Sequence, residues 1–312
     1  ARTLGHCLAA LAQQAGTPGA CEVIVADDAS TDGSAAIARE HGARVVSLAR
    51  RRGPAAARNA GARAAQGEFL LFIDADCEPH PRWLAAILQP LADPDVAAVY
   101  GAYRSAQRAL VARFAQAEFE ERFARLARRE RIDFMATHAV AFRRSVFEAL
   151  GGFCEELRGN EDVELAYRLS QGGRRIAFAP EAYVYHEHPA TLGAYLRTKA
   201  SRGYWRTRVY ARYPHKAWAD DYTPAWLKLQ VLSALAAAAA LVVAAVLPWA
   251  WVAAAPALLL LGACSIPLAR SVGRRQLDLL LAAPWLSVAR SAALAAGALA
   301  GLAVAAVERW RA

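Results

Sequence analysis

The sequence predicts an α/β layered domain followed by an apolar helical region. Short apolar runs alternate with helical stretches between residues 22 and 100. From Leu229 onward, apart from one basic loop, the sequence is nearly all Ala, Leu, Val and Trp, and this end raises the hydrophobic fraction of the 312-residue chain to 56%. We therefore expect two parts, a globular domain at residues 1–222 and a membrane region at residues 223–312.

The globular part begins with an amphipathic helix that places Leu4, Leu8 and Leu11 on one face. Four apolar runs then read as strands buried on both faces: residues 22–26, 44–48, 69–73 and 96–100. Helices are predicted between them at residues 32–41, 54–66 and 81–91. This alternation predicts a parallel sheet with right-handed crossovers, in which ligands bind at the carboxyl ends of the strands.

The chain beyond Tyr100 continues with a charged helix, a second helix, two short strands and an arginine-rich helix. We place them at residues 108–131, 163–171, 174–179, 182–188 and 191–213. Residues 229–247 and 249–268 each approach the ~20 residues that a bilayer core requires, and Pro248 and Trp249 mark the turn between them. Arg270, Arg274 and Arg275 then indicate a return to the cytoplasmic side.

The last segment allows more than one arrangement. Pro284 is expected to break residues 277–290, which read as an interfacial helix, and residues 291–307 are either a third span or a re-entrant element. A single crossing there would place Arg309 and Arg311 on the unfavourable side of the membrane.

Charge and cysteine content limit the classes of partner. The net charge of +9 comes mostly from arginine, and such an excess serves nucleic acid, anionic lipid or a phosphate-bearing substrate. The sequence contains no zinc-finger spacing, and the arginine-rich helix lies just ahead of the apolar region, where basic residues usually face the cytoplasm and its anionic lipid. We therefore expect no nucleic-acid partner. The five cysteines are scattered without a CxxC pair, which indicates a reducing compartment rather than a disulfide framework or zinc site.

Two predicted strands end in acids. Asp27 and Asp28 follow one strand, and Asp74 and Asp76 follow another. Four carboxylates on one rim repel each other unless a cation or hydrogen-bond donors lie among them, so the rim predicts a divalent metal, a hydrogen-bonding ligand, or both. The Asp74–Asp76 pair alone is equally typical of a turn, and it also matches phosphatases that form an aspartyl-phosphate, although those carry Thr or Val where this chain has Glu78.

Arg58 lies one turn into a predicted helix that begins at Gly53 and Pro54. A helix N-terminus and a guanidinium together form a site for a diphosphate. Asp28 is either a turn residue or an acceptor for a base N–H or a ribose hydroxyl.

Four stretches occur in a characteristic order: "EVIVADDASTDGS", "GPAAARNAGARAAQGEFLLFIDADC", "AFRRSVFEALGGF" and "GNEDVELAYRLSQGG". Together, from about Arg2 to His188, they resemble the inverting family 2 glycosyltransferases of the GT-A fold. The resemblance implies a Rossmann-like mixed sheet. Members usually begin with an additional strand that contacts the base, and we expect that first strand to be missing here. The apolar end is similar to that of membrane-bound members.

The resemblance also assigns donor-side roles. Asp28 would hold the base or ribose, with Asp27 in support, and Arg58 would lie near the base and diphosphate. Asp76 would bind a divalent metal, Mg²⁺ or Mn²⁺, and Asp74 would lie near the ribose and the metal.

On the acceptor side, Glu161 and Asp162 match the acidic pair that contains the general base, and we assign the base to Asp162. A capped helix whose acids complement the macrodipole is the plain alternative. Thr137 and His138 stand where relatives often have Gly-Asn, so sugar and acceptor contacts are expected there.

Three further residues have open assignments. His186 is either a third metal ligand or a structural histidine. Arg202 and Trp205, in "RGYWR", are similar to the Arg-Trp motif of processive synthases, but snorkelling arginines on an interfacial helix explain the stretch equally well.

The expected activity is an inverting transfer of a sugar from a UDP- or GDP-linked donor to a hydroxyl acceptor. The acceptor would be lipid-linked or a cell-envelope polysaccharide. The enzyme would be a multi-pass protein of the cytoplasmic membrane with its catalytic domain in the cytosol. The alternatives are a nucleotidyltransferase or phosphatase on a similar sheet, and a catalytically degenerate membrane scaffold of the same fold.

Overall fold

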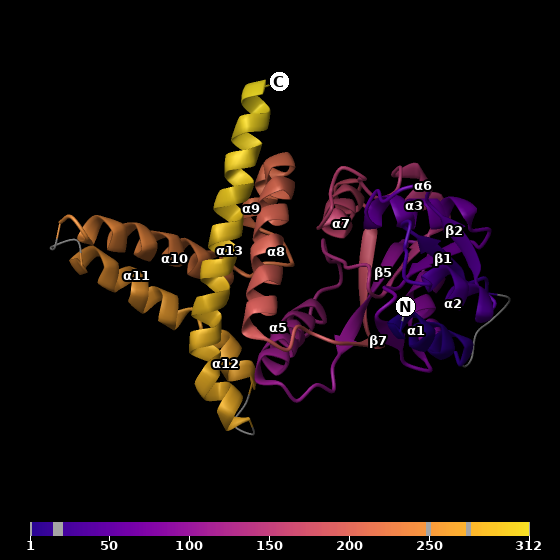
Figure 1. Cartoon of the computed structure of the whole chain (residues 1–312), viewed down its shortest axis with the longest axis horizontal. Helices are drawn as coiled ribbons and strands as arrows, with labels where there is room; N and C mark the ends of the chain where they lie inside the picture. The colour runs from indigo at the N-terminus through magenta and orange to yellow at the C-terminus, as the bar shows by residue number, and fades with distance from the viewer. Residues whose placement is uncertain (1, 15–20, 248–250, 273–275, 312) are drawn as a thin grey trace. The chain divides into compact units, whose positions relative to one another are not determined.

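The computed structural model describes residues 2–14, 21–247, 251–272 and 276–311 (Figure 1). Contacts divide the chain into two compact units. Unit 1 comprises residues 1–106 and 123–187, and unit 2 comprises residues 107–122 and 188–312. This division differs from the expected boundary at residue 222 because the arginine-rich helix before that residue packs with the C-terminal helices. The expected boundary separates a catalytic from a membrane region and stays a prediction.

Unit 1 is an α/β unit whose elements follow the predicted order. In chain order they are α1 (Arg2–Ala12), β1 (Ile24–Asp27), α2 (Ser34–Glu40), β2 (Arg44–Ser47), α3 (Pro54–Ala64), β3 (Phe69–Phe72), β4 (Cys77–Pro79), α4 (Trp83–Leu88), η1 (Gln89–Ala92), β5 (Val96–Arg104), β6 (Val140–Arg143), α6 (Arg144–Ala149), α7 (Glu161–Gln171) and β7 (Arg175–His186). The amphipathic first helix is confirmed, since Leu4 and Leu8 are buried against Ala38 and Ala43.

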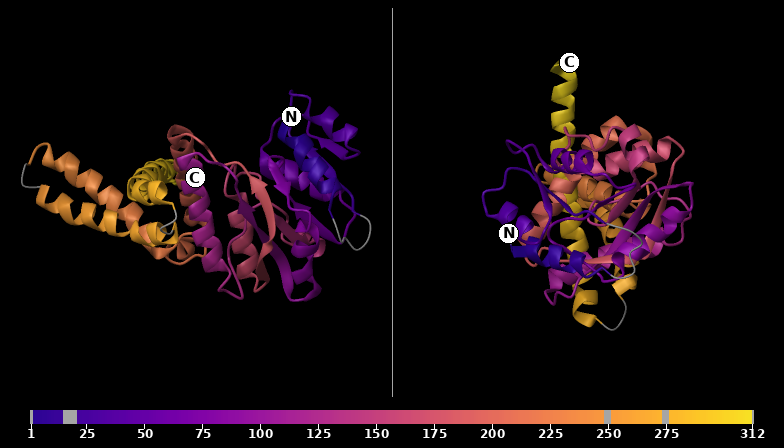
Figure 2. Two further views of the ribbon diagram at one scale, coloured as in Figure 1. Left: turned by 90° about the horizontal axis from the view of Figure 1, so that it is seen from below. Right: turned by 90° about the vertical axis from the view of Figure 1, so that its right-hand side faces the viewer.

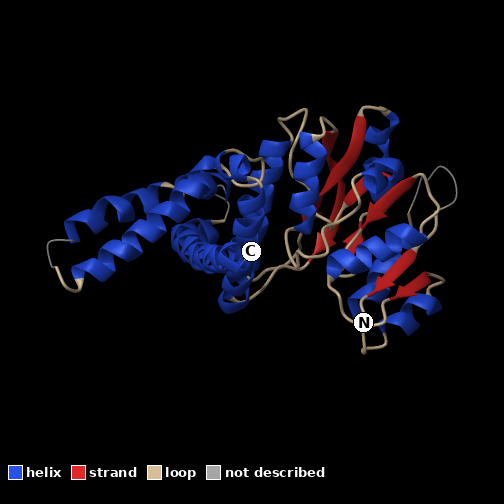
Figure 3. Ribbon diagram, turned by 90° about the horizontal axis from the view of Figure 1, so that it is seen from above, coloured by secondary structure: helices blue, strands red, loops and turns tan. Residues whose placement is uncertain are grey.

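The strands form two sheets (Figure 3). Strands β1 and β2 pair in parallel. The five-stranded sheet has the order β3-β6-β5-β7-β4, in which β5 and β7 are parallel and the other three pairs are antiparallel. The mixed sheet of the GT-A fold is therefore confirmed, and the single parallel sheet expected from the strand–helix alternation is wrong.

The physical reason is β6, a strand from much later in the chain that lies between β3 and β5 and runs antiparallel to both. Val140, Ala141 and Phe142 on it are almost fully buried. The segment that contains α4 therefore leads the chain from β3 to β5 without making the two strands neighbours, because β6 later occupies the position between them.

The sheet core is aromatic on one side of β6. Phe142 packs edge-on against Phe72 and Phe147, and Phe153 joins the same cluster. Strand β7 is continuous, whereas two short strands were predicted, because it pairs with β5 across two register shifts. Gly101 on β5 lies where a Cβ would overlap the carbonyl oxygen of Ala182, so only glycine allows this close approach.

Unit 2 is helical. It contains the first part of α5 (Leu110–Leu126), whose last residues belong to unit 1, followed by α8 (Leu192–Arg212), α9 (Pro214–Trp218), α10 (Ala225–Ala244), α11 (Trp251–Ala263), α12 (Ile266–Val272) and α13 (Leu277–Arg311). Helices α8 and α13 run side by side (Figures 1 and 2). Gly203, Gly297 and Gly301 permit their backbones to approach, because a Cβ at any of them would meet the other helix.

The apolar end differs from the prediction in two places. Helix α13 passes through Pro284 without a break, and ion pairs with α5 lie on both sides of the proline, Asp278 with Arg113 and Arg290 with Glu118. The expected span at residues 249–268 is instead divided between α11 and α12.

Among the described residues, two helices are long and apolar enough to cross a membrane, Ala225–Ala244 and Leu277–Glu308. The predicted turn at Pro248 and Trp249, and Arg274 and Arg275, lie outside the described residues.

Candidate active site

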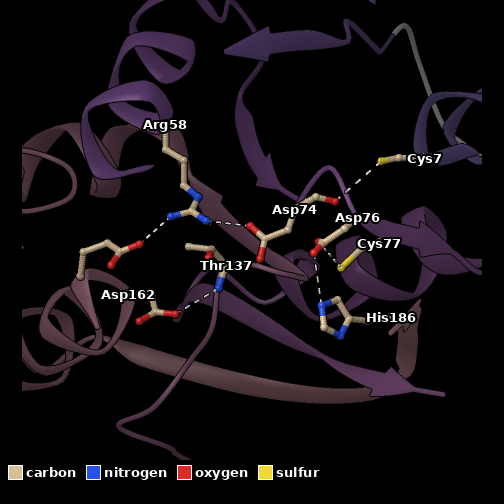
Figure 4. A network of polar contacts seen from close by, with 9 residues as sticks. Cys7, Arg58, Asp74, Asp76, Cys77, Thr137, Asp162 and His186 are labelled. Carbon is tan, nitrogen blue, oxygen red and sulfur yellow. Dashed lines mark hydrogen bonds and ion pairs between the residues drawn. The ribbon is translucent and has the colours of Figure 1, made fainter. Parts of the chain in front are cut away.

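The turn between β3 and β4 carries Asp74 and Asp76 to the sheet edge (Figure 4). Strand β4 pairs with β7 so that Cys77 lies opposite His186. This register brings Nε2 of His186 within 3.4 Å of Oδ2 of Asp76. The hydrogen bond from His186 holds the pKa of Asp76 below its ordinary value, although partial burial opposes this shift.

Asp76, Cys77 and His186 are grouped closely enough for a metal site. Their potential ligand atoms all lie within 4.8 Å of one another. The carboxylate of Asp76 is more than half exposed and accessible to an incoming ion, whereas Cys77 is fully buried. Burial, reinforced by Asp74 and Asp76, raises the pKa of the Cys77 thiol well above its usual range, so it remains protonated. The donor set that fits Mg²⁺ or Mn²⁺ is therefore Asp76 with His186.

Arg58 connects two parts of the site. It lies in the second turn of α3, and its two terminal nitrogens donate to Oδ1 of Asp74 at 2.7 Å and Oε1 of Glu161 at 2.6 Å. Asp74, predicted beside the metal, thus has its carboxylate engaged by Arg58. The guanidinium fixes the position of the strand-end acid relative to the start of α7.

Glu161 and Asp162 form the first turn of α7, where carboxylates complement the helix dipole. Oδ1 of Asp162 accepts from the N–H of Val163 at 2.8 Å, and Oδ2 lies 3.4 Å from the backbone nitrogen of Thr137. Glu161 is 5% exposed. Burial, and secondly the charge of Asp162, raises the pKa of Glu161 to about 7 against the opposing effect of Arg58. Glu161 is therefore held by Arg58, and Asp162 is the more accessible acid.

This shift makes unfolding pH-dependent. Because the pKa of Glu161 rises from 4.5 to about 7 on folding, the folded chain binds more protons than the unfolded chain between those values. Stability should fall as pH rises through that window, by at most about 3.5 kcal/mol at roughly 1.4 kcal/mol per pKa unit. In Glu161→Gln, a Tm series across the same window should show a shallower decline. An equal decline in both proteins would contradict the assignment.

The two acids at the end of β1 bind backbone N–H groups, Asp28 at the start of α3 and Asp27 in the turn after β1. Each oxygen of Asp28 accepts one backbone N–H, from Arg52 at 2.7 Å and Gly53 at 2.9 Å. Asp27 is buried and accepts from the N–H of Ser30 at 3.0 Å. The sequence did not predict this link between β1 and α3, because Asp28 was considered there as a local turn residue or a ligand contact. The role of Asp28 toward a base or ribose stays a prediction.

Thr137 and His138 are buried beside the acids. The ring of His138 stacks on Tyr103, with ring centroids 3.4 Å apart, and Tyr103 stacks on His186 at 4.8 Å. The sequence analysis did not predict Tyr103, near the end of β5, as a site residue. Its position near the carboxyl end of a strand was the only indication in the sequence. Unit 1 thus brings together Arg58, Asp74, Asp76, Asp162 and His186 (Figure 4).

Arg202 and Trp205 lie on α8 in unit 2. Arg202 stands over the ring of Phe119, and the Trp205 ring contacts Tyr204. Their part in the site stays a prediction.

Comparison with known proteins gives three findings. The model of the family described as Glycosyl transferase family 2 matches residues 1–151. Among curated proteins, the pre-mycofactocin glycosyltransferase of Mycobacterium tuberculosis is 30% identical over 203 residues, which cover 62% of this chain and 43% of that protein. Glycosyltransferase AglE of Haloferax volcanii is 29% identical over 202 residues, 61% of this chain and 64% of AglE. The chain thus spans less than two thirds of either relative.

Among solved structures, the mannosyltransferase PcManGT from Pyrobaculum calidifontis, in complex with GDP-Man and Mn²⁺, is similar over 97% of this chain and 84% of its own. The TM-score is 0.66 and the sequence identity is 26%.

Proposed function

The chain belongs to glycosyl transferase family 2 and has the GT-A fold, and from this membership we propose that it transfers a sugar from a nucleotide-diphospho-sugar to a hydroxyl acceptor with inversion. The observation that carries the proposal is the Arg58 bridge. It joins Asp74, beside the candidate metal ligands, to Glu161, beside the candidate base. Donor-side and acceptor-side groups thus meet in one unit.

The donor side would be organised around a divalent ion. Asp76 and His186 would hold Mg²⁺ or Mn²⁺, with Asp74 close by, and the bound ion would neutralise charge on the diphosphate leaving group. The similarity to PcManGT, whose structure contains GDP-Man and Mn²⁺, supports this choice. Arg58 has five N–H donors, so it can keep both carboxylates and still point a donor toward the diphosphate. Asp28 and Asp27 would frame the pocket for the UDP or GDP nucleoside.

The acceptor side would use Asp162 as general base. Its carboxylate would take the proton of the acceptor hydroxyl while the hydroxyl oxygen forms a bond to the anomeric carbon. The bond from that carbon to the diphosphate breaks at the same time, and the nucleoside diphosphate leaves from the opposite face. The N–H groups of Val163 and Thr137 orient the carboxylate for this role. Thr137 and His138 would contact the sugar or acceptor.

The apolar helices of unit 2 support attachment to a membrane. We propose that this is the cytoplasmic membrane, with the catalytic unit in the cytosol, and that the acceptor is lipid-linked or a cell-envelope polysaccharide. Arg202 and Trp205 on α8 would contribute to the acceptor or product path.

The test is a donor panel. Membranes containing the full chain are incubated with UDP- and GDP-sugars and Mn²⁺ or Mg²⁺, and nucleoside diphosphate release and sugar incorporation are measured. We expect one donor to give both. Release of pyrophosphate or phosphate would favour a nucleotidyltransferase or phosphatase, and no binding of any donor would favour a degenerate scaffold.

A further inference from the structure

Helix α13 exposes apolar side chains along its length. They are Leu277, Leu281, Trp285, Leu299, Leu302 and Val307, with Leu281 75% and Trp285 78% exposed. At 3.6 residues per turn these positions fall on one side of the helix. Ala292 and Ala296 continue the same exposed stripe between them. A continuous apolar face of this length marks contact with a membrane or another protein.

The opposite face of α13 is buried and polar. Arg290 is 1% exposed; its terminal nitrogens donate to Oε1 of Glu118 on α5 at 2.9 Å and to Oε1 of Gln230 on α10 at 2.6 Å. Glu118 also pairs with Lys199 of α8 at 2.8 Å. The mid-part of α13 is therefore surrounded by protein on this face, because a buried arginine needs these partners.

Ion pairs tie both ends of α13 to other helices of unit 2. Near its start, Asp278 pairs with Arg113 of α5 at 2.6 Å, and near its end Glu308 pairs with Arg208 of α8 at 3.0 Å. Helix α8 lies beside α13 and carries several further cations: Arg197, Lys199, Arg202, Arg206 and Arg212. Among these cations Arg197 and Arg212 are exposed, and a helix with exposed charges does not enter hydrocarbon, since each such charge there costs several kcal/mol.

The dimensions of α13 agree with this. The 32-residue apolar stretch Leu277–Glu308 is about 48 Å long, whereas the hydrocarbon core is ~30 Å thick. Figures 1 and 2 show that α10 and α11 project sideways from α13 as a hairpin. Helix α10 has 20 residues, about 30 Å, and exposes only apolar side chains along its second half. If the hairpin enters the bilayer along the membrane normal, α13, from which it projects sideways, lies along the membrane plane.

We propose that α13 lies in the membrane–water interface with its apolar face in lipid, and that only the α10–α11 hairpin penetrates the hydrocarbon core. Both ends of α13 then stay on the cytosolic side, at the level of the headgroups. The partner of the apolar face is the lipid bilayer, because the exposed stripe from Leu281 to Leu302 carries no charge and belongs to the same unit as the apolar helix α10. The inference rests on the membrane attachment contained in the proposed function.

The test measures depth along α13. Leu281→Cys and Leu299→Cys lie about five turns apart on the same side. Each variant is made in the full chain after the accessible Cys21 and Cys154 are replaced by Ser; Cys7, Cys77 and Cys264 are buried. The protein is placed in phosphatidylglycerol-containing liposomes, and nitroxide depth is read from oxygen and nickel-chelate accessibility. We expect equal, shallow depths, whereas a spanning helix separates the two labels by about 27 Å.

Helix α10 provides the matched control. Leu232→Cys and Val242→Cys are both exposed on it, and their labels should differ in depth by about 15 Å. A depth difference on α13 like that on α10, or labels on α13 that contact only water, would overturn the inference.

A second measurement, of labelling from either side of the membrane, tests the arrangement if the nitroxide labels disturb folding. Gln276→Cys and Ala306→Cys, near the two ends of α13, are tested with an impermeant maleimide in sealed vesicles of both orientations. Both should react from the cytosolic face; reaction from opposite faces means that α13 crosses. The transfer assay on the same membranes separates the two proposals, because an inactive chain with equal label depths refutes the function and leaves the membrane arrangement standing.

Discussion

Asp162→Asn is expected to lower the rate of sugar transfer by about 10²–10⁴-fold, the usual contribution of a positioned general base. The amide keeps one carbonyl oxygen, which can accept from the N–H of Val163 as Oδ1 does, so the first turn of α7 should hold its geometry. The amide NH₂ group replaces Oδ2 and cannot accept from the N–H of Thr137, which lies 3.4 Å from Oδ2 in the unsubstituted chain. It cannot take the acceptor proton. Turnover of the full chain in membranes should therefore fall while the affinities for donor and Mn²⁺ stay unchanged.

Asp95→Asn is the matched control, since Asp95 is an exposed acid of the same unit in the turn before β5. Its activity should equal that of the unsubstituted chain. Transfer at the normal rate by Asp162→Asn, combined with loss of transfer in Glu161→Gln, would move the base to Glu161.

Asp76→Ala should remove the principal metal ligand. Loss of a residue that only supports a metal ligand typically lowers metal affinity by about 10–100-fold, and we expect the loss of Asp76 itself to lower Mn²⁺ affinity further. Donor binding should weaken with it. Mn²⁺ titration followed by electron paramagnetic resonance on the purified full chain measures the loss directly.

Glu78→Ala provides the comparison, because Glu78 is an exposed acid two positions further on whose carboxylate pairs with exposed His6. Its Mn²⁺ affinity should be unchanged. Equal Mn²⁺ affinity in Asp76→Ala would show that the ion binds elsewhere.

The parts of the fold that depend on local sequence were predicted well. Leu4 and Leu8 identify the first helix, Pro54 marks the start of α3, and the runs before Asp27 and Asp74 are the strands β1 and β3. These features follow from periodicity, turn residues and caps, all of which act over a few positions.

Strand order was not predictable in this way. The pairing of β6 with both β3 and β5, and the continuity of β7, depend on contacts between distant residues. The continuity of α13 through Pro284 likewise runs against the local preference of proline, and ion pairs with α5 lie on both sides of it, Arg113 with Asp278 and Glu118 with Arg290.

The candidate site shows the same limit. The sequence order of the motifs selected Arg58, Asp74 and Glu161 individually, but not the bridge that joins them, because Arg58 and Glu161 are 103 positions apart. Tyr103 is a further case. Its stacking between His138 and His186 requires the register of β5 and β7, which no single stretch encodes.

The central claim is that the chain couples release of a nucleoside diphosphate to transfer of a sugar. Its most direct test is the ratio of the two products when membranes containing the full chain turn over the preferred nucleotide sugar with Mn²⁺. We predict one nucleoside diphosphate for each sugar transferred, with both products lost in Asp162→Asn. Release of pyrophosphate or inorganic phosphate, or a transferred product without sugar, would contradict it.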